Sequence, residues 1–512
     1  MKTTIRLFKD TYVDSVIQLS GTRAMRQAEG VDWAAAAMAT PANLDTLRSE
    51  GFTDDCSGAG ANDLFLAVRA AGQDAIDAAL TAGETAMFAA RAGGDTDAQS
   101  DRAPRTLERA LENQPSTNVA VISVPGDYAA LEAHKALSAG LDVLLFSDNV
   151  SVEDEIALKE RAERLGHLVM GPGAGTAMLG RTCLGFANVV EPGRVGVIAA
   201  AGTGAQEVAT LLDRWGVGVS HVIGLGGRDL SGAVGGRMAK VAVKALCADP
   251  DTDVILLVSK PPEESVARSV VETAQDKPLV AAMIGLQAEF DVPANVALTG
   301  TLEGGAVKAV ELLGADAPNL TGNLRQRVAE AGDRLGPDRT LIRGLYSGGT
   351  LCYESLVILS KFVGPVHSNT PIQESWMVPE PPGSHVCLDL GEEEYTKGRP
   401  HPMIDPEARI ELLRKQGADP QVAAILMDVV LGHGAHPDPA GQLAPVCADI
   451  AARGGPVVVA YVLGTERDPQ GLEAQRRALE EAGCIVTETA ARASLAAAAI
   501  ALRDPDLVGE VL

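Results

Sequence analysis

VGVIAAAGTGAQEVATLL, residues 195–212, decides the fold of this chain. The continuous apolar run at its start is typical of a strand that is buried on both faces of a parallel sheet. A glycine-containing turn ends the strand, and the apolar residues beyond the turn recur with the spacing of a helix. The stretch therefore predicts a strand–helix unit, and similar units follow one another from residue 118 to about residue 500.

Two glycine-rich turns precede predicted helices, one at 202–204 and one at 347–350 within LIRGLYSGGTLCYES. Glycine lets the main chain approach an anion closely, and a helix start offers unpaired N–H groups and the positive end of the helix dipole. Each turn taken alone could also be glycine-rich for packing only. Because two such turns occur, we expect them to hold one phosphate or acyl phosphate, through Gly202, Thr203, Gly204, Ser347, Gly348, Gly349 and Thr350.

Neither turn is a Walker A loop, because GxxxxGK[ST] does not occur in the sequence, and P-loop nucleotide hydrolysis is therefore not expected. The net charge of −25 argues against nucleic acid and anionic membranes as partners. Seven scattered cysteines without a CxxC pair favour a reduced, cytoplasmic protein. MKTTIRLFKD lacks the apolar core of a signal peptide, and no apolar stretch is long enough to span a bilayer.

The 512 residues predict about three or four domains, with aromatic residues contributing only 3% of the chain. The expected fold class is α/β, with several doubly wound parallel-sheet domains, both Rossmann-like and flavodoxin-like, behind an N-terminal ferredoxin-like α+β domain. Strands are expected at 2–8, 32–39 and 64–70 in the N-terminal domain. The boundaries are 1–95 for the ferredoxin-like domain, 96–117 for a linker, 118–190 for a Rossmann-like domain, 191–335 for a second α/β domain, 336–380 for the second glycine-rich turn and a connection, and 381–512 for a flavodoxin-like domain.

The residues resemble those of succinyl-CoA synthetase. EPGRVGVIAAAGTGAQEVATLL and VIGLGGRDLSGAVGGRMAKVAVKAL are similar to its α subunit, and GLYSGGTLCYESLVIL stands where its β subunit presents a phosphate-facing helix. The resemblance implies a CoA-binding-type domain at 118–190, an α-type ligase domain at 191–335 and a β-type C-terminal domain at 381–512. The fused order, the N-terminal extension and IRGLYSGGTLC together resemble the FdrA family over nearly the whole chain.

The chain departs from the synthetase pattern where that enzyme carries its phosphohistidine between the two helix starts. Glu303, in TGTLEGGAVKA, stands at the position of the histidine, and Ser259 and Lys260 stand where a glutamate orients it. The glycine-rich CoA loop has no counterpart in residues 1–117, and the nucleotide-grasping domain is absent from the sequence. The resemblance thus implies Glu303 as a catalytic carboxylate that forms an acyl-phosphate-type intermediate, and Lys260 as an additional cation.

The FdrA resemblance implies a carbamoyltransferase of the oxamate type, active in ureide or purine catabolism. In that hypothesis the chain handles phosphate or carbamoyl phosphate for a small carbamoyl or acyl acceptor, in a hetero-oligomer with companion subunits. Two alternatives stay open. One is an ADP-forming acyl-CoA synthetase of the succinate–CoA ligase type, which would bind CoA. The other is a non-catalytic assembly subunit.

Several further residues are candidates for the site. His433 and His436, in HGAHPDP, follow a buried strand and are either acid–base groups or part of a polar loop. No metal site is expected there, because a third ligand is not visible nearby. Substrate-binding candidates are Arg228 after GLGG, Arg343 before the second turn, and Arg399, which with His401 lies in a charged segment; an ion pair or a solvated surface is the alternative for each.

Overall fold

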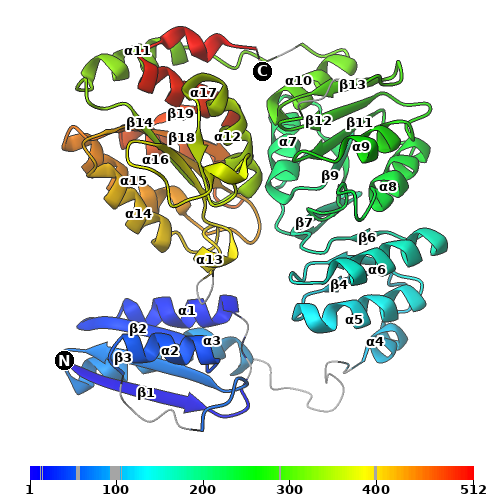
Figure 1. The fold of residues 1–512 in the computed structure, drawn as a ribbon. Helices are drawn as coiled ribbons and strands as arrows, with labels where there is room; N and C mark the ends of the chain where they lie inside the picture. Colours follow the sequence, from blue (N-terminus) through cyan, green and yellow to red (C-terminus); the bar gives the residue numbers. More distant parts are fainter. Residues whose placement is uncertain are drawn as a thin grey trace. The chain divides into compact units, whose positions relative to one another are not determined.

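The protein is described by a computed structural model, which covers residues 1–511 except 12, 14, 53–57, 93–103, 105, 287–289, 317 and 397–399. The chain divides into two compact units, the first made by residues 1–105 and the second by residues 106–396 and 401–512. Figure 1 labels their helices and strands. Within the described residues, no helix combines the length and the apolar character needed to cross a bilayer.

The first unit is a three-stranded antiparallel sheet covered by helices, with strand order β1-β3-β2. Because β1 and β2 both run antiparallel to β3, they are parallel to each other, which is the split β-α-β arrangement of ferredoxin-like folds. The three predicted strands are confirmed, whereas the helix α2, capped by Thr40, had not been expected. The elements are β1 Lys2–Phe8, α1 Ser15–Arg26, β2 Val31–Met38, α2 Pro41–Ser49, β3 Leu64–Ala70 and α3 Gln73–Ala92.

The predicted linker, 96–117, includes a short helix, α4 (Leu107–Asn113), and residues 93–103 lie outside the described residues. A small parallel sheet of order β4-β5-β6 follows, as predicted for a Rossmann-like domain. Its elements are β4 Val119–Ile122, α5 Gly126–Ser138, β5 Asp142–Leu145, α6 Val152–Leu165 and β6 Val169–Met170.

A seven-stranded sheet comes next, in the order β13-β12-β11-β9-β10-β7-β8. Strands β9 to β13 are parallel, whereas the hairpin β7–β8 adds two antiparallel strands at one edge, although its residues lie within the predicted 118–190 domain. The strands are β7 Thr176–Leu179, β8 Thr182–Gly185, β9 Pro192–Ala199, β10 Val219–Gly224, β11 Val254–Ser259, β12 Leu279–Met283 and β13 Val296–Thr299; the helices are α7 Gly202–Arg214, α8 Arg237–Ala248, α9 Glu264–Val271 and α10 Leu302–Leu312.

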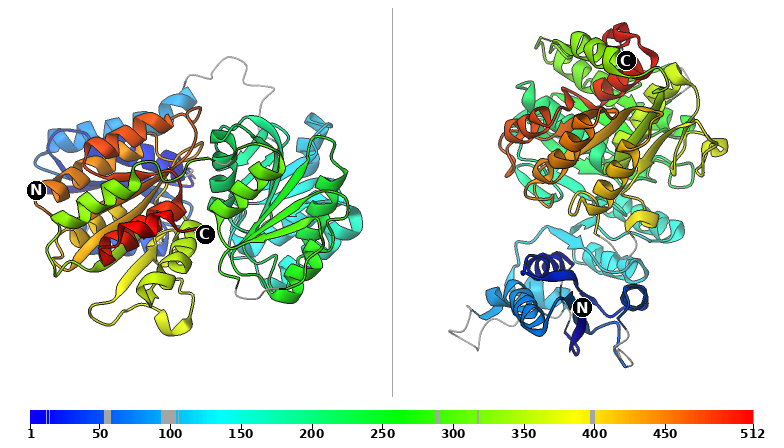
Figure 2. Two further views of the ribbon diagram at one scale, coloured as in Figure 1. Left: turned by 90° about the horizontal axis from the view of Figure 1, so that it is seen from above. Right: turned by 90° about the vertical axis from the view of Figure 1, so that its left-hand side faces the viewer.

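The last sheet has six parallel strands in the order β15-β16-β14-β17-β18-β19. Two of its strands, β14 and β15, come from 336–380. The sequence predicts this segment as a separate connection, whereas in the structure it shares the sheet with 381–512. Helices cover both faces (Figure 2). The strands are β14 Leu341–Tyr346, β15 Val366–His367, β16 His385–Asp389, β17 Val422–Val430, β18 Val457–Leu463 and β19 Ile485–Thr487; the helices are α11 Leu324–Arg334, α12 Gly349–Val363, α13 Glu393–Thr396, α14 Glu407–Gly417, α15 Pro439–Ala452, α16 Leu472–Glu481 and α17 Ala490–Leu502, with single 3-10 turns at Glu374–Trp376 and Pro505–Gly509.

The two large sheets share one hydrophobic core. Helices α7 and α10 pack on the inner face of the seven-stranded sheet, and α12 and α17 pack on the inner face of the six-stranded sheet. These four helices lie against one another between the sheets (Figure 1). Their contact brings together two parts of the chain that are far apart in the sequence, and it includes both predicted glycine-rich turns.

Candidate active site

Each glycine-rich turn lies where the strand order of its sheet reverses. β9 has β10 on one side and β11 on the other, and β14 has β16 on one side and β17 on the other. Open α/β sheets bind ligands outside the carboxyl ends of strands at such switch points. The start of α7 follows β9 and the start of α12 follows β14, so both turns occupy this position.

The two helix starts touch directly through their threonines. The N–H of Thr350 donates a hydrogen bond to Oγ1 of Thr203 at 3.3 Å. A Cβ placed on Gly204 would lie 2.9 Å from Cγ2 of Thr350, and one on Gly348 would lie 3.0 Å from Cγ2 of Thr203. The structure thus brings the predicted residues together, and the approach is so close that these two glycines are needed for packing as well.

The start of α12 already holds an anion that belongs to the protein. The carboxylate of Asp428, in the buried strand β17, accepts hydrogen bonds from N–H and Oγ of Ser347 and from N–H of Gly348, at 2.7–2.9 Å. Arg409, which is also buried, donates to Asp428 Oδ1 at 2.9 Å. The donor groups of Ser347 and Gly348 are therefore occupied by Asp428. The start of α7 has no side-chain cap, so its first N–H groups remain for a ligand.

A second carboxylate, Asp389, lies beside the start of α12 at the end of β16. It is 3% exposed, and its Oδ1 accepts a hydrogen bond from N–H of Gly391 at 2.9 Å. A Cβ on Gly349 would lie 2.2 Å from Oδ2, so this oxygen faces the first turn of α12. The side chain of Asn369 holds the main chain of Asp389 on both sides, donating to its carbonyl and accepting from its N–H.

The charges around Asp389 come from several elements. Burial raises the pKa of Asp389 to about 6, and the ammonium of Lys260, which follows β11, opposes this shift. The charges of Glu392 and Asp428 raise the pKa further. Lys260 Nζ lies 5.6 Å from the centre of the Tyr353 ring and has no hydrogen-bond or ion-pair partner among the described residues. Lys260 follows a strand of the seven-stranded sheet, and its charge acts on Asp389 of the six-stranded sheet. By the described contacts, its ammonium is available to bind an anion.

His401 is the third titratable group at this place. Its Nδ1 accepts a hydrogen bond from N–H of Met403 at 3.3 Å, and its Nε2 would lie 2.7 Å from a Cβ on Gly391. Burial lowers the pKa of His401, and the charge of Asp428 opposes the shift. The imidazole is thus neutral at neutral pH, beside the loop that hydrogen-bonds Asp389.

The predicted catalytic residue Glu303 has a different environment. It is 3% exposed at the start of α10, and its Oε1 is paired with Arg492 Nη2. Its Oε2 accepts from Arg492 Nε at 3.1 Å and from the Thr489 hydroxyl at 2.5 Å. A carboxylate with both oxygens engaged by a buried guanidinium ties α10 to α17, and no described hydrogen bond links it to the two turns. Its catalytic role stays a prediction that this geometry does not favour.

Two further glutamates reveal a repeat within the two turns. Both helices begin with Gly-Thr and carry a glutamate four residues after the threonine, Glu207 in α7 and Glu354 in α12. Both side chains are buried, and one oxygen of each has no hydrogen-bond partner among the residues that the structure describes. Burial raises the pKa of Glu207 to about 7 and that of Glu354 to about 8, and the charge of Glu207 adds to the shift of Glu354.

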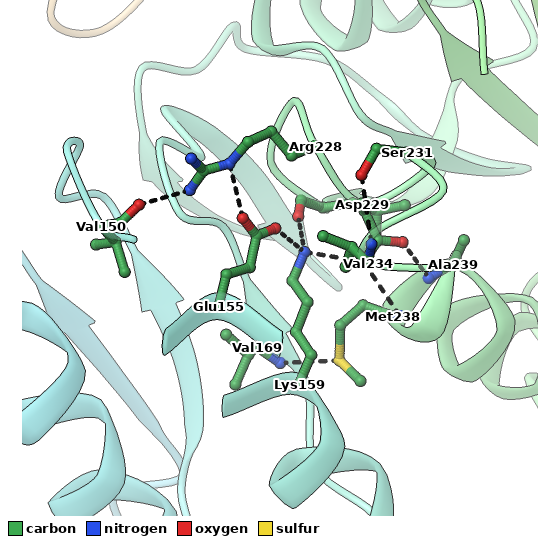
Figure 3. Close-up of polar contacts among 11 residues, drawn as sticks. Val150, Glu155, Lys159, Val169, Arg228, Asp229, Ser231, Val234, Met238 and Ala239 are labelled. Carbon is green, nitrogen blue, oxygen red and sulfur yellow. Dashed lines mark hydrogen bonds and ion pairs between the residues drawn. The ribbon is translucent and has the colours of Figure 1, made fainter. Parts of the chain in front are cut away.

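The substrate-binding candidate Arg228 is part of an ion-pair cluster. Its Nε donates to Oε2 of Glu155 at 2.8 Å and its Nη2 to the carbonyl of Val150 at 2.7 Å. Behind it, the fully buried ammonium of Lys159 donates to Glu155, to Asp229 and to the carbonyl of Leu225 (Figure 3). The cluster joins α6 of the small sheet to the loop after β10, and the substrate-binding role of Arg228 stays a prediction.

The other predicted residues are not brought to the two turns by described contacts. Arg343 donates to the carbonyls of Ile342 and Ser384 and to the side chain of Gln416. His433 pairs through its main chain with Ala187, and Nδ1 of His436 accepts from N–H of Asp438 at 3.0 Å. Arg399 lies outside the described residues. No group of three or more His, Cys, Asp or Glu side chains within the described part of the chain is arranged to hold a metal ion.

Comparisons with known proteins identify two domain types. The family model described as CoA-ligase matches residues 345–500, and the model described as the heavy metal-associated domain of AllF matches residues 1–104. The α-2 subunit of the ADP-forming succinate–CoA ligase of Trichomonas vaginalis is 29% identical, over 43% of this chain and 74% of its own length. A solved acetyl-coenzyme A synthetase 1 from Ca. Korarchaeum cryptofilum, in complex with phosphate and ADP, is 16% identical over 77% of this chain and 84% of that one, with a TM-score of 0.28.

One relative matches along the whole chain. The protein YahF of Escherichia coli (strain K12) is 38% identical over 510 residues, which cover 97% of this chain and 98% of YahF. Its match includes the two glycine-rich turns, the CoA-ligase domain and the N-terminal unit together. The chain therefore belongs to the family of YahF, and its C-terminal part is a domain of the CoA-ligase type.

Proposed function

We propose that this chain is the acyl-phosphate-handling core of an acyl-CoA-synthetase-type enzyme, with its site where the starts of α7 and α12 meet. The observation that carries the proposal is the ammonium of Lys260, which has no hydrogen-bond or ion-pair partner among the described residues and lies over the Tyr353 ring of α12. The start of α12 meets the start of α7, and both lie at the switch points of their sheets. Such preorganised positive charge stabilises the negative charge that moves between phosphate and carboxylate oxygens in acyl transfer.

The acyl-CoA synthetase alternative is better supported than the carbamoyltransferase hypothesis. A CoA-ligase model matches the C-terminal part, and the named function of the Trichomonas relative is also that of a CoA ligase. Carbamoyl phosphate is itself an acyl phosphate, so the same site could take it, and the substrate test below includes it. Because that relative is a subunit, we also propose that companion subunits supply groups that bind CoA or nucleotide.

The assignment predicts a large effect of removing the Lys260 charge. Lys260→Met is expected to weaken phosphate binding about ten- to a hundredfold, because a charge-assisted hydrogen bond contributes about 1.5–3 kcal/mol. Binding of inorganic phosphate is measured by isothermal titration calorimetry. Turnover is measured with acetyl phosphate or carbamoyl phosphate, with and without CoA. Lys308→Met is the control, because Lys308 forms an exposed ion pair with Glu311 on α10.

Two results would contradict the proposal. One is phosphate binding that is unchanged in Lys260→Met. The other is an absence of phosphate binding in the unaltered protein at millimolar concentration. Turnover of carbamoyl phosphate alone would favour the carbamoyltransferase hypothesis, whereas acyl-CoA formation would favour the synthetase.

Gly349 provides a second test at the opposite helix start. An alanine Cβ there would meet Oδ2 of Asp389 at 2.2 Å, so the carboxylate would have to leave the start of α12. We expect Gly349→Ala to change phosphate affinity at least about tenfold, or about 1.4 kcal/mol. Gly336→Ala serves as the control, because nothing lies within 4 Å of a Cβ at that glycine. Equal phosphate affinities in the two variants would show that the start of α12 does not take part in phosphate binding.

A further inference from the structure

One carboxylate oxygen of a buried residue near the two helix starts has no hydrogen-bond partner within the described part of the chain. Oδ1 of Asp389 accepts from N–H of Gly391, whereas no hydrogen bond to Oδ2 is formed within the described part of the chain. This oxygen faces the first turn of α12, where a Cβ on Gly349 would lie 2.2 Å away. The residue as a whole is 3% exposed, and its Oδ2, without a described partner, lies at the place where we expect phosphate.

We propose that Asp389 accepts the phosphoryl group of an acyl phosphate, forming an aspartyl phosphate at Oδ2. The inference deepens the proposed function and rests on it. Asp389 lies at the carboxyl end of β16, next to the switch point at β14, and the Asn369 side chain fixes its main chain on both sides. The ammonium of Lys260, which forms no ion pair with a described residue, is the nearby cation that would stabilise the charge of the phosphoryl group.

The transfer balances without a further reactant. An electron pair of Oδ2 forms the new O–P bond, and the bond between phosphorus and the acyl oxygen breaks. The leaving electron pair stays on the acyl oxygen, so a free carboxylate is released and no proton moves. Carboxylate side chains are established phosphoryl acceptors in other enzymes, and the mixed anhydride that forms conserves the energy of the substrate anhydride.

The other buried carboxylates near this place are less suited to the step. Both oxygens of Asp428 accept hydrogen bonds from the second turn, and Arg409 adds a further one. Both oxygens of Glu303 are engaged by Arg492. Glu207 and Glu354 each have an oxygen without a described hydrogen-bond partner, but these atoms are buried where α7 packs against α12. By the contacts of the described residues, Asp389 is the one of these five that combines an oxygen without a partner with a position at the start of α12.

The experiment is to incubate the full chain with acetyl phosphate that carries a radioactive phosphoryl group, and then to assay the denatured protein. We expect acid-stable label that hydroxylamine releases, because an acyl phosphate has both properties. Mass spectrometry is expected to place it on the peptide that contains Asp389. Asp389→Asn should lose the label, whereas Glu392→Gln, at an exposed position three residues later, should keep it.

The variants also separate this inference from the proposed function. Phosphate binding by unaltered protein and by Asp389→Asn is measured in parallel, together with circular dichroism to verify folding. Phosphate binding without any covalent label would overturn the role of Asp389 and leave the proposed function standing. Label that persists in Asp389→Asn, or that is acid-labile as on a histidine, would also overturn it. An absence of both label and phosphate binding would overturn both proposals.

Discussion

Replacing Lys159 with methionine is expected to lower the free energy of unfolding of the region around α6 by about 3–5 kcal/mol. The ammonium of Lys159 is fully buried and lies 2.8 Å from both Glu155 and Asp229. Without the ammonium, the buried carboxylate of Asp229 loses its ion-pair partner, and that of Glu155 keeps only Arg228. The penalty for leaving buried charge unpaired is larger than the value of an ion pair in water, so this single change should be among the most damaging in the chain.

Hydrogen exchange measured by mass spectrometry on peptides from α6 and α8 reports the effect locally, which matters because a chain of several domains does not unfold in one step. The matched control is Arg228→Met, which removes a cation from the same Glu155. The Arg228 side chain is 44% exposed, so its loss should stay within about 1 kcal/mol. Equal losses of unfolding free energy in Lys159→Met and Arg228→Met would show that burial does not determine how much each cation stabilises this cluster.

The second large effect concerns pH and the buried glutamates of the two helices. Glu354 has a pKa of about 8 when folded, chiefly because it is buried, against 4.5 as the ordinary value. Glu207 of α7 and Glu303 of α10 add negative charge around it, and Arg492 of α17 neutralises Glu303. Below pH 4.5 the carboxyl is protonated in both folded and unfolded chains, so its stabilising contribution is complete. As pH rises toward 8 the unfolded chain loses its proton first, and this contribution is lost.

At about 1.4 kcal/mol for each pH unit, Glu354 alone lowers stability by about 5 kcal/mol between pH 4.5 and 8. Glu354→Gln is expected to remove this part of the pH dependence, so the variant should gain stability over the unaltered protein between pH 5 and 8. Urea unfolding followed by Trp215, at the end of α7, measures the difference, with Trp33 and Trp376 replaced by phenylalanine in both proteins. Parallel stability curves for the two proteins would contradict a protonated Glu354.

The sheets could be predicted from the sequence because their strands are buried on both faces. All nine residues of β17, VAAILMDVV, are buried, and the sequence shows this directly as an apolar run. The two turns could be predicted because each glycine-rich stretch stands between an apolar strand and a helical pattern, and because two of them occur in one chain. Their direct contact through Thr203 and Thr350 was not predictable, because it depends on how two sheets separated in sequence pack together.

The partners of the turns were harder to identify than the turns. Asp428 lies inside an apolar strand, and Asp389 ends one just before an acidic run, so neither stands out in the sequence as a partner of a glycine-rich turn. The position of Asp389 at a strand's carboxyl end is the signal that could have identified it. Glu303 was assigned from the position of a histidine in another family, and such an assignment does not reveal the guanidinium of Arg492 that pairs with it. The Gly-Thr repeat with its glutamate was visible in the sequence and would have linked α7 to α12 directly.

The contact between Thr203 and Thr350 also determines how the site responds to dilution. The two residues are 147 positions apart on one polypeptide, so the chain itself keeps the two helix starts at a high effective concentration. A site assembled from separate chains would lose activity as the protein is diluted below the dissociation constant of its subunits. The two helix starts of this protein should stay together at any concentration, and only steps that need a separate partner should depend on the amount of protein present.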